Sequence, residues 1–484
     1  MNKKHIVCTQ CVMDTSDKDI YFNEKGVCSH CLNFDETYHV SPAQEEENLA
    51  SLAVKLKSHS AKYDCIVGMS GGVDSSYVAH LAAEMNLNPL VVHLDNGWNS
   101  RLAIRNVAKI IDKHQFDLET LIIDWQEFRD LQKAFLRAGV IDIELLTDHA
   151  ITATLYRLAQ KHNIKYILSG VNYATEHGMP LSWNWNKDDK TNIEAIHKQF
   201  GEVKLSTFPL ISQKKLASLR QSETGPESIN VLNLINYSAA RAKQELQSGY
   251  GWEAYSGKHF ESVFTRFYQS YILPVKFGVD KRKVHLSALI RNGEINREQA
   301  MLELAKPAIE NRQLLRDRDY VIDKLEMDLE SFEGLMKSSP VPHEHYASDF
   351  TASHQLRKQS GFIANLFKKE SQVEKQASAL LKHYLDRYQG KTFVIYCAGE
   401  IGARTLEQAR EKGVYEKIVA VVDNKANHNQ HNLGDILVQS PEVLGSLDFE
   451  VLLIASHKYQ DEIFQNLISL PNMTEKTLIR LRDC

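Results

Sequence analysis

A glycine-serine loop between a strand pattern and a helix pattern constrains the fold of this chain most. Residues 63–69 are mostly apolar, residues 70–76 read SGGVDSS, and residues 78–85 carry apolar side chains at helical spacing. Gly71 and Gly72 permit a tight turn that brings backbone N–H groups close to an anion, and the helix N-terminus adds its positive dipole end. We therefore expect a strand, a pyrophosphate-binding loop and a helix; the alternative is a turn that merely joins them.

The serines of this loop, Ser70, Ser75 and Ser76, add hydroxyl donors for the same anion. No GK[ST] follows, so the loop is not of the Walker A type. The form SGGxDS resembles the ATP pyrophosphatase (PP-loop) superfamily, whose members cleave ATP between the α and β phosphates. The resemblance implies that ATP is consumed to AMP and pyrophosphate.

The composition and charge favour a globular protein and disfavour nucleic acid or a membrane as a partner. The 484 residues suffice for about three domains, and 43% hydrophobic with 25% charged residues is typical of globular proteins. A net charge of -5 without a long Lys/Arg tract argues against nucleic acid as a partner. No apolar stretch approaches the roughly 20 residues that span a bilayer, so we expect no membrane association and a cytoplasmic location.

The patterns along the chain predict an α/β protein in four parts. Residues 1–40 carry cysteine pairs, 45–300 alternate strands and helices as a PP-loop domain, 301–387 read as a helical extension and connector, and 388–484 restart a Rossmann-like pattern. Short apolar strands between amphipathic helices indicate a parallel sheet covered on both faces. Ser70, Asp95 and Gly170 all follow such strands, and should meet at one crevice. The three strands expected after the loop lie at 89–94, 121–123 and 165–170.

Two cysteine pairs near the N-terminus have the spacing of a metal site. Cys8-x-x-Cys11 and Cys28-x-x-Cys31 are separated by sixteen residues, which fits four thiolates around one zinc ion. Disulfides are disfavoured in a reducing cytosol, and an iron–sulfur cluster is disfavoured because no redox chemistry elsewhere requires one. We therefore expect structural Zn²⁺.

A wider set of motifs resembles the N-acetyl sugar amidotransferases of surface-glycan biosynthesis (WbpG/PseA-type), over roughly residues 5–345. The resemblance implies ATP-dependent conversion of a sugar N-acetyl group into an acetamidino group, for lipopolysaccharide or flagellar glycans that contain sugars such as pseudaminic or legionaminic acid. Besides the cysteines and SGGVDSS, the motifs are LDNGWNS (94–100), LSGVNYATE (168–176), GKHFESVFTRF (257–267), KFGVDKR (276–282), LSALI (286–290) and GEINREQA (293–300).

This chemistry assigns expected roles around the nucleotide. Asp74 and Asp95 are the carboxylates expected to hold Mg²⁺ or to orient the loop, although Asp74 could instead only cap a helix. Gly170 and Asn172 begin a loop that lies near the nucleotide in PP-loop enzymes.

Further residues are expected at the sugar. Glu176 follows the same loop, and Trp183 and Trp185 could stack on a sugar or nucleotide or could pack a lid. If residues 258–266 are helical, Lys258, Glu261 and Ser262 share a face that Arg266 continues, with His259 beside it. That segment is either a cationic wall with Lys258 and Arg266 on phosphate, or a solvated salt-bridged helix.

The remaining cysteines provide no evident activated thiol. Cys65 lies within a strand pattern, Cys397 lies in a glycine motif and Cys484 ends the sequence. Nucleophilic glutamine hydrolysis or sulfur transfer needs such a thiol beside a base. We therefore expect a separate glutaminase subunit to supply ammonia, as the resemblance also implies, and we disfavour a tRNA thiolase.

The C-terminal part has the pattern of a Rossmann-like half. A strand pattern at 391–396 leads into CAGEIG, residues 397–402, and a second strand pattern ends at Asp423. Cys397 replaces the first glycine, so nucleotide binding and a docking or oligomerisation role both stay open, and homo-oligomers are compatible with the latter. A tRNA-modifying PP-loop ligase and a nucleotide-sensing scaffold without catalysis remain the alternative functions.

Overall fold

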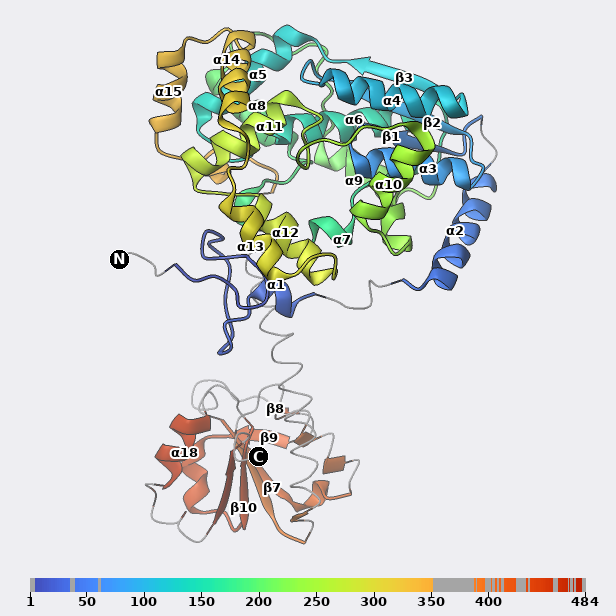
Figure 1. The fold of residues 1–484 in the computed structure, drawn as a ribbon. Helices are drawn as coiled ribbons and strands as arrows, with labels where there is room; N and C mark the ends of the chain where they lie inside the picture. Colours follow the sequence, from blue (N-terminus) through green and yellow to red (C-terminus); the bar gives the residue numbers. More distant parts are fainter. Residues whose placement is uncertain are drawn as a thin grey trace. The chain divides into compact units, whose positions relative to one another are not determined.

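The computed structural model separates the chain into two compact units, Met1–Gln359 and Ser360–Cys484, each described by itself below (Figure 1). The structure describes residues 5–34, 40–59 and 62–350, and most of 387–480. The gaps in that last range are 389, 397–401, 403–404, 407–408, 411–412, 424–431, 434–435, 456–459, 469, 471–472 and 474–475. The expected connector at 351–386 lies outside the described residues.

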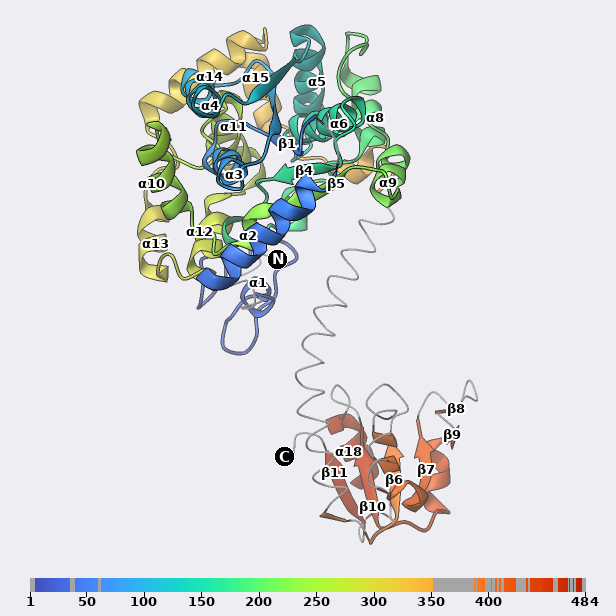
Figure 2. The same cartoon turned by 90° about the vertical axis from the view of Figure 1, so that its right-hand side faces the viewer.

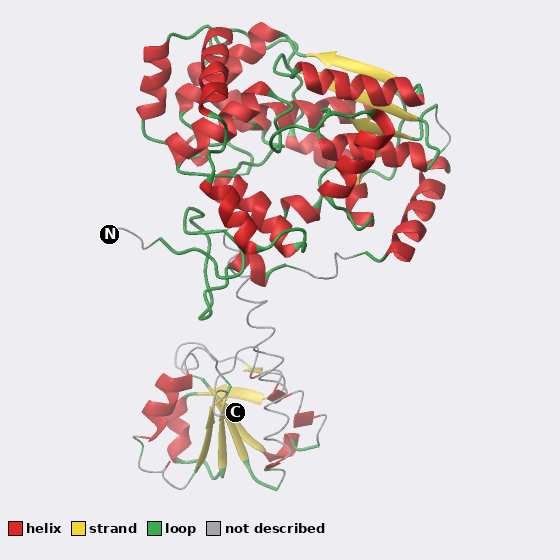
Figure 3. Ribbon diagram, in the orientation of Figure 1, coloured by secondary structure: helices red, strands yellow, loops and turns green. Residues whose placement is uncertain are grey.

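The first unit is built on a five-stranded parallel sheet of order β3-β2-β1-β4-β5. The expected strand before the loop is β1, which pairs in parallel with β2 and β4 on either side. Helices surround this sheet (Figure 3). The prediction of a parallel α/β sheet is confirmed, with one further strand, β5, that the sequence patterns did not indicate. The strands are β1 (Cys65–Gly68), β2 (Pro89–Asp95), β3 (Asp117–Ile122), β4 (Tyr166–Ser169) and β5 (Glu227–Asn230).

Alternating side chains of the central strands enter two different cores. Val67 and Val91 lie in one buried cluster, whereas Ile66, Leu90 and Val92 lie in another. Successive side chains of a strand point to opposite faces, so both faces of the sheet are covered. Strand side chains that are buried on both faces explain why the sequence showed apolar runs rather than alternation.

Fifteen helices belong to the described part of the first unit, and polar caps fix where many of them start. Ser100 caps α4 and Asp124 caps α5, each accepting from a backbone N–H in the first turn, and Asn296 forms a capping box with Gln299 at α13. The helices are α1 (Ser29–Leu32), α2 (Pro42–Lys57), α3 (Val73–Glu84), α4 (Arg101–His114), α5 (Trp125–Ala138), α6 (Leu145–Lys161), α7 (Tyr173–Glu176), α8 (Lys190–Phe200), α9 (Gln213–Gln221), α10 (Ala239–Tyr250), α11 (Val263–Phe267), α12 (Arg282–Arg291), α13 (Arg297–Ala305), α14 (Asn311–Lys324) and α15 (Leu329–Lys337).

The cysteine segment is part of this first unit. Cys8, Cys11 and Cys28 belong to the same buried cluster as residues of α5, α6 and α11. Figure 1 shows the segment in dark blue beside the yellow helices α12 and α13. A wide helical segment of π type, η4 (Tyr268–Phe277), connects α11 with the turn before α12. Helices far along the chain therefore lie against its beginning.

The second unit contains its own sheet of order β11-β10-β6-β7-β9-β8 (Figure 2). All described pairings are parallel except that of β8 with β9. The expected strands at 391–396 and before Asp423 are β6 and β7, but residues 397–401 of the glycine motif lie outside the described residues. The elements are β6 (Phe393–Tyr396), β7 (Ile418–Val422), β8 (Asn432–Leu433), β9 (Ile436–Gln439), β10 (Val451–Ile454), α18 (Gln460–Ile468) and β11 (Thr477–Arg480).

Among the described residues, none of the helices combines the length and the apolar character needed to cross a membrane.

Candidate functional site

The glycine-serine loop has the conformation of an anion cradle at the C-terminal end of β1. Gly71 has a φ of +85°, and a Cβ atom there would lie 2.6 Å from the Ala103 carbonyl oxygen. Both the conformation and the space therefore require glycine. The loop is also braced from within, because the Ser75 hydroxyl accepts from the Ser70 N–H at 3.1 Å and Ser70 Oγ accepts from the Gly72 N–H at 3.2 Å.

Two aromatic side chains hold the back of this loop. The Trp252 indole N–H and the Tyr255 hydroxyl both donate to the Gly71 carbonyl, at 3.3 and 2.9 Å. Helix α3 starts directly after Gly72, so the N–H groups of its first turn have no partner inside the helix. Those donors and the dipole of α3 face the loop, which fits a phosphate group of ATP.

Asp74 is held by tyrosine and lysine side chains. Its Oδ1 accepts from the Tyr237 hydroxyl, and its Oδ2 lies 3.6 Å from the Lys258 ammonium. Gly72 is the N-cap of α3 and no side chain caps that end, so the capping alternative for Asp74 is wrong. Asp74 instead connects the loop to Lys258, and its suitability for Mg²⁺ stays a prediction.

Lys258 lies at the centre of a partly buried charge network, with 22% of its side chain exposed. Its ammonium donates to Thr175 Oγ1 at 2.9 Å and to Glu176 Oε1 at 3.2 Å. Burial alone would lower the pKa of Lys258, but Asp74 and Glu176 outweigh burial and raise it. Burial likewise would raise the pKa of Glu176, but Lys258 and then His259 hold it below its ordinary value. Both groups are therefore charged at neutral pH.

The loop opens on a cavity of about 560 Å³. Its near wall includes Ser70, Asp74, Ser75 and Gly170, which confirms that the loop and the end of β4 meet at one crevice. The far wall comes from the second half of this unit, with side chains from η4, α12 and α13. Those far residues are Gln269, Ser270, Lys281, Arg282, His285, Leu286, Leu289 and Glu303.

Two titratable side chains of the far wall, Lys281 and His285, each have a polar atom without a hydrogen-bond partner among the described residues. No hydrogen bond or ion pair of the Lys281 ammonium occurs among the described residues, and burial lowers its pKa. The His285 Nδ1 lies 3.3 Å from the Thr175 carbonyl oxygen, while its Nε2 is buried with no partner in the described part of the chain. Burial, and after it the charges of Lys258 and His259, hold the pKa of His285 well below its ordinary value. His285 is therefore neutral and its Nδ1 carries the proton.

The segment that contains Lys258 is not the helix that the spacing suggested. Residues 257–262 form turns, His259 has a φ of +63°, and α11 begins only at Val263. Lys258, His259 and Glu261 nevertheless all line the cavity. His259 Nδ1 lies 3.9 Å from Glu261 Oε1, and a Cβ on Gly72 would lie 2.8 Å from that same oxygen. The segment closes over the loop as a turn rather than along one helix face.

Arg266 has a different partner from the expected phosphate. Its guanidinium forms a two-point ion pair with Asp317 of α14, at 2.6 and 2.7 Å. Both side chains are mostly buried, with 15% and 4% of their surfaces exposed. Arg266 thus joins α11 to α14, and the geometry does not support a role on ATP phosphates.

The two tryptophans are also packed away from the loop. Trp183 and Trp185 are 1% and 4% exposed, so neither offers a free face for stacking on a sugar. The Trp185 indole N–H donates to Asp189 Oδ2 at 2.8 Å, and its ring stacks on His343 at 5.1 Å. Of the two interpretations, packing is the one that the geometry supports.

Three other expected ligands have structural roles or lie away from the cavity. Asp95 Oδ1 accepts from the Gly97 N–H at 2.9 Å in the turn after β2, and Asn172 caps α7 by accepting from the Thr175 N–H at 2.8 Å. Ser76 is fully buried, and its hydroxyl has no partner among the described residues. None of the three is among the residues that line the cavity.

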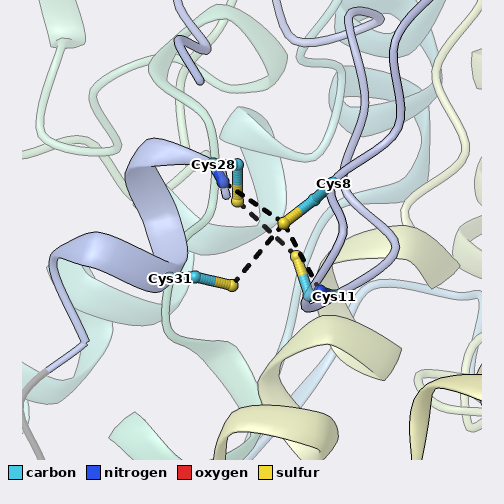
Figure 4. A group of neighbouring side chains, drawn as sticks. All are labelled: Cys8, Cys11, Cys28 and Cys31. Carbon is cyan, nitrogen blue, oxygen red and sulfur yellow. Dashed lines mark hydrogen bonds between the residues drawn. The ribbon is translucent and has the colours of Figure 1, made fainter. Parts of the chain in front are cut away.

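The four cysteines converge on one point (Figure 4). Their sulfur atoms all lie within 4.8 Å of one another, with 3.6 Å between Cys11 and Cys28 and 4.0 Å between Cys8 and Cys31. Zn–S bonds of about 2.3 Å in a tetrahedron need sulfurs roughly 3.8 Å apart, so this set fits zinc. The backbone N–H of Cys28 also points at Cys8 Sγ, at 3.2 Å, which stabilises a thiolate. A closed set of four sulfurs leaves no ligand position open, which indicates a structural site.

Residues Tyr237, Thr175, Lys281 and His285 were not identified from the sequence. Lys281 and His285 are one turn apart and both precede an apolar stretch, so helical spacing was the available signal. Tyr237 carries no sequence signal, and Thr175 lies within the motif LSGVNYATE without being singled out there, because the roles of both depend on contacts with Asp74 and Lys258 far along the chain.

Three segments of the chain match known families. Residues 52–171 match the asparagine synthase family, residues 261–357 match the C-terminal domain of LPS biosynthesis protein WbpG-like proteins, and residues 390–479 match the N-terminal domain of C2185-like proteins. The first segment contains the loop and β1 to β4, and the second contains α11 to α15 with the far wall of the cavity.

Two individual proteins are similar to parts of this chain. The uncharacterized protein MJ1599 of Methanocaldococcus jannaschii is 25% identical over 309 residues, which is 62% of this chain and 94% of that protein. The NH(3)-dependent NAD(+) synthetase of Mycoplasma genitalium is 28% identical over 191 residues, which is 34% of this chain and 70% of that enzyme.

Two solved structures are similar to part of this chain but superpose poorly on the chain as a whole. An NH3-dependent NAD synthetase from Campylobacter jejuni has a TM-score of 0.25 at 12% identity, covering 56% of this chain and 98% of that one. The NMN synthetase from Francisella tularensis has a TM-score of 0.24 at 16% identity, covering 47% and 91%.

The loop, the cavity and the matched families all indicate a protein that uses ATP. The asparagine synthase match with an intact SGGVDSS loop supports an ATP-using enzyme of the PP-loop ligase type. The match over residues 261–357 confirms the resemblance on which the expected sugar chemistry rested. The two matches together support a WbpG-type PP-loop family for this chain.

Proposed function

We propose that this protein is an ATP-dependent amidotransferase that converts the N-acetyl group of a sugar into an acetamidino group. The observation that carries the proposal is that one cavity is bounded by both matched segments, the loop on one side and α12 on the other. ATP would occupy the loop side and the acceptor sugar the α12 side.

The chemistry explains why both sides are needed. An amide carbonyl is a poor electrophile, so its oxygen first attacks the α-phosphorus of ATP and pyrophosphate leaves. Ammonia then adds to the activated carbon, and AMP departs with the former carbonyl oxygen. The products balance as acetamidino sugar, AMP and pyrophosphate.

The residues supply what each step requires. The α3 N-terminus and the Ser70 and Ser75 hydroxyls would hold the departing pyrophosphate, with Mg²⁺ on its oxygens. Lys258 would stabilise charge that develops at the α-phosphate, because Asp74 and Glu176 hold it at the loop. His285 has a lone pair on Nε2 that no described residue uses, which suits acceptance of a proton from the attacking ammonia.

We propose the nitrogen source and the acceptor from the side chains of the described residues and from the proteins that this chain resembles. The Mycoplasma relative is named as NH(3)-dependent, and the free cysteines of the described residues offer no exposed thiol beside a base, so ammonia would come from a separate glutaminase. The WbpG-like match favours a sugar of lipopolysaccharide or a related surface glycan. The Lys281 ammonium, which has no ion pair within the described ranges, suits an acceptor that carries a negative charge, such as a nucleotide sugar or a sugar acid.

The test is incubation with Mg-ATP, ammonium and a panel of N-acetyl sugars, sugar acids and nucleotide sugars. Mass spectrometry should detect exchange of O for NH in one acceptor together with equal amounts of AMP. The Lys258→Met protein is the control for contaminating activity. Formation of AMP with tRNA but with no acetamido sugar would contradict the proposal.

A further inference from the structure

Helix α12 presents two functionally different faces. Lys281, His285 and Leu289, spaced one turn apart, line the cavity. Lys283, Ser287 and Arg291 follow the same spacing but are offset by two residues. An offset of two residues places a second stripe on nearly the opposite side of a helix.

The second face binds the cysteine segment. The Val12 N–H donates to Ser287 Oγ at 3.2 Å, and the Lys283 ammonium donates to Asp14 Oδ2 at 2.5 Å. Ser287 is fully buried and Asp14 is 2% exposed, whereas the Lys283 side chain keeps 21% of its surface exposed. Burial would raise the pKa of Asp14, but Lys283 and Ser16 outweigh it and the pKa falls to about 2. The ion pair is therefore intact throughout the neutral range.

Helix α13 adds a direct contact to the cysteine turns. Arg297, in its first turn, donates from Nε to the carbonyl oxygens of Cys8 and Cys11, at 3.2 and 3.0 Å. One guanidinium thus holds both ends of the first cysteine pair. Helices α12 and α13 contact each other, so this segment braces the part of the far wall that these two helices form.

The glycine-serine loop has supports of its own. The loop is anchored by β1, by α3 and by the two aromatic donors on the Gly71 carbonyl. None of the contacts described for the cysteine segment reaches residues 70–76. Disturbing that segment should therefore move α12 and leave the backbone of the glycine-serine loop in place.

We propose that the four-cysteine segment is a clamp that positions the cavity face of α12, with Arg297 and Ser287 as positioning residues for the acceptor rather than for ATP. The clamp holds Lys281 and His285 at the acceptor through the back of their own helix. A zinc ion on the four thiolates would make the clamp rigid. The part that concerns the acceptor rests on the proposed function.

Arg297→Ala tests the clamp, with Arg297→Lys as the conservative variant and Arg312→Ala as the matched control. Arg312 is an exposed arginine in the first turn of α14. Loss of the two part-buried hydrogen bonds of the Arg297 Nε–H should raise KM for the acceptor about tenfold and leave KM for ATP within about twofold. Arg297→Lys should recover part of the acceptor affinity, and Arg312→Ala should match the parent. Equal loss for both substrates, or no loss, would overturn the inference.

Hydrogen exchange supplies a readout that needs no acceptor. In Arg297→Ala, and in Ser287→Ala, amides of residues 282–291 should exchange faster while those of α3 remain unchanged, with zinc content retained. Removal of zinc from the parent by a chelator should give the same pattern. Unchanged exchange in α12 would contradict the clamp, whereas failure of every acceptor with faster exchange would contradict only the proposed function.

Discussion

Replacing Gly71 with alanine tests the conformation of the loop most strictly. The left-handed φ of +85° costs an L-residue about 1–2 kcal/mol. The new Cβ would also lie 2.6 Å from the Ala103 carbonyl oxygen and 3.0 Å from its Cα, and overpacking of this kind costs about 1–3 kcal/mol. Because these two atoms belong to the backbone of α4, neither can rotate away. We expect Gly71→Ala to lose about 2–5 kcal/mol of unfolding free energy.

The assay is urea denaturation with and without ATP, read by circular dichroism. Gly249→Ala is the matched control, because Gly249 lies within α10 and a Cβ there would meet open space, so the change should be neutral or stabilising by up to about 1 kcal/mol. If Gly71→Ala unfolds at the same urea concentration as the parent and still gains stability from ATP, the reasoning about the loop is refuted.

Three further predictions concern other parts of the site. Lys258→Met should reduce turnover about 10²–10³-fold, measured as pyrophosphate release. In that variant burial raises the pKa of Glu176 above its unfolded value of about 4.3, so the deficit in unfolding free energy should be largest near neutral pH and should shrink on acidification; a deficit constant with pH would exclude the coupling. Zinc on the four thiolates predicts that Cys11→Ser purifies with less zinc than the parent, measured by metal analysis, and equal zinc content in the two proteins would rule out the four-thiolate site. Arg266→Ala should lose about 3–5 kcal/mol of stability because its buried carboxylate partner is left unpaired, with KM for ATP unchanged; a raised KM at parental stability would restore the phosphate role.

Local features of this chain were predictable from its sequence. The strand, loop and helix around residues 65–84 follow from apolar pattern and glycine chemistry within twenty residues, and the structure has them where the pattern indicates. The cysteine pairs converge as their spacing predicts, because each pair lies within one tight turn. Such features need no information from the rest of the chain.

Long-range pairings were not predictable. Arg266 is engaged by Asp317, fifty-one residues later, and no pattern near Arg266 indicates that partner. Trp183 and Trp185 look like stacking residues in sequence but are buried by packing from other segments. The sequence pattern did not indicate strand β5, because its residues, Glu227–Asn230, are mostly polar and lie at the edge of the sheet.

The helix predicted around Lys258 was wrong because the chain forms a turn there. The spacing of Lys258, Glu261 and Arg266 fits a helix face, but His259 adopts a positive φ and the chain turns over the loop. The cavity residues Lys258 and Glu261 were thus identified correctly by type and placed on the wrong element.

The fate of the acetamido oxygen tests the central claim most directly. An acceptor whose N-acetyl carbonyl carries a heavy oxygen isotope is incubated with the enzyme, Mg-ATP and ammonium, and the nucleotide product is analysed by mass spectrometry. Adenylation of the carbonyl oxygen predicts AMP that contains the heavy oxygen, in step with formation of the acetamidino sugar. Release of ADP, or of AMP without the label, would contradict the account.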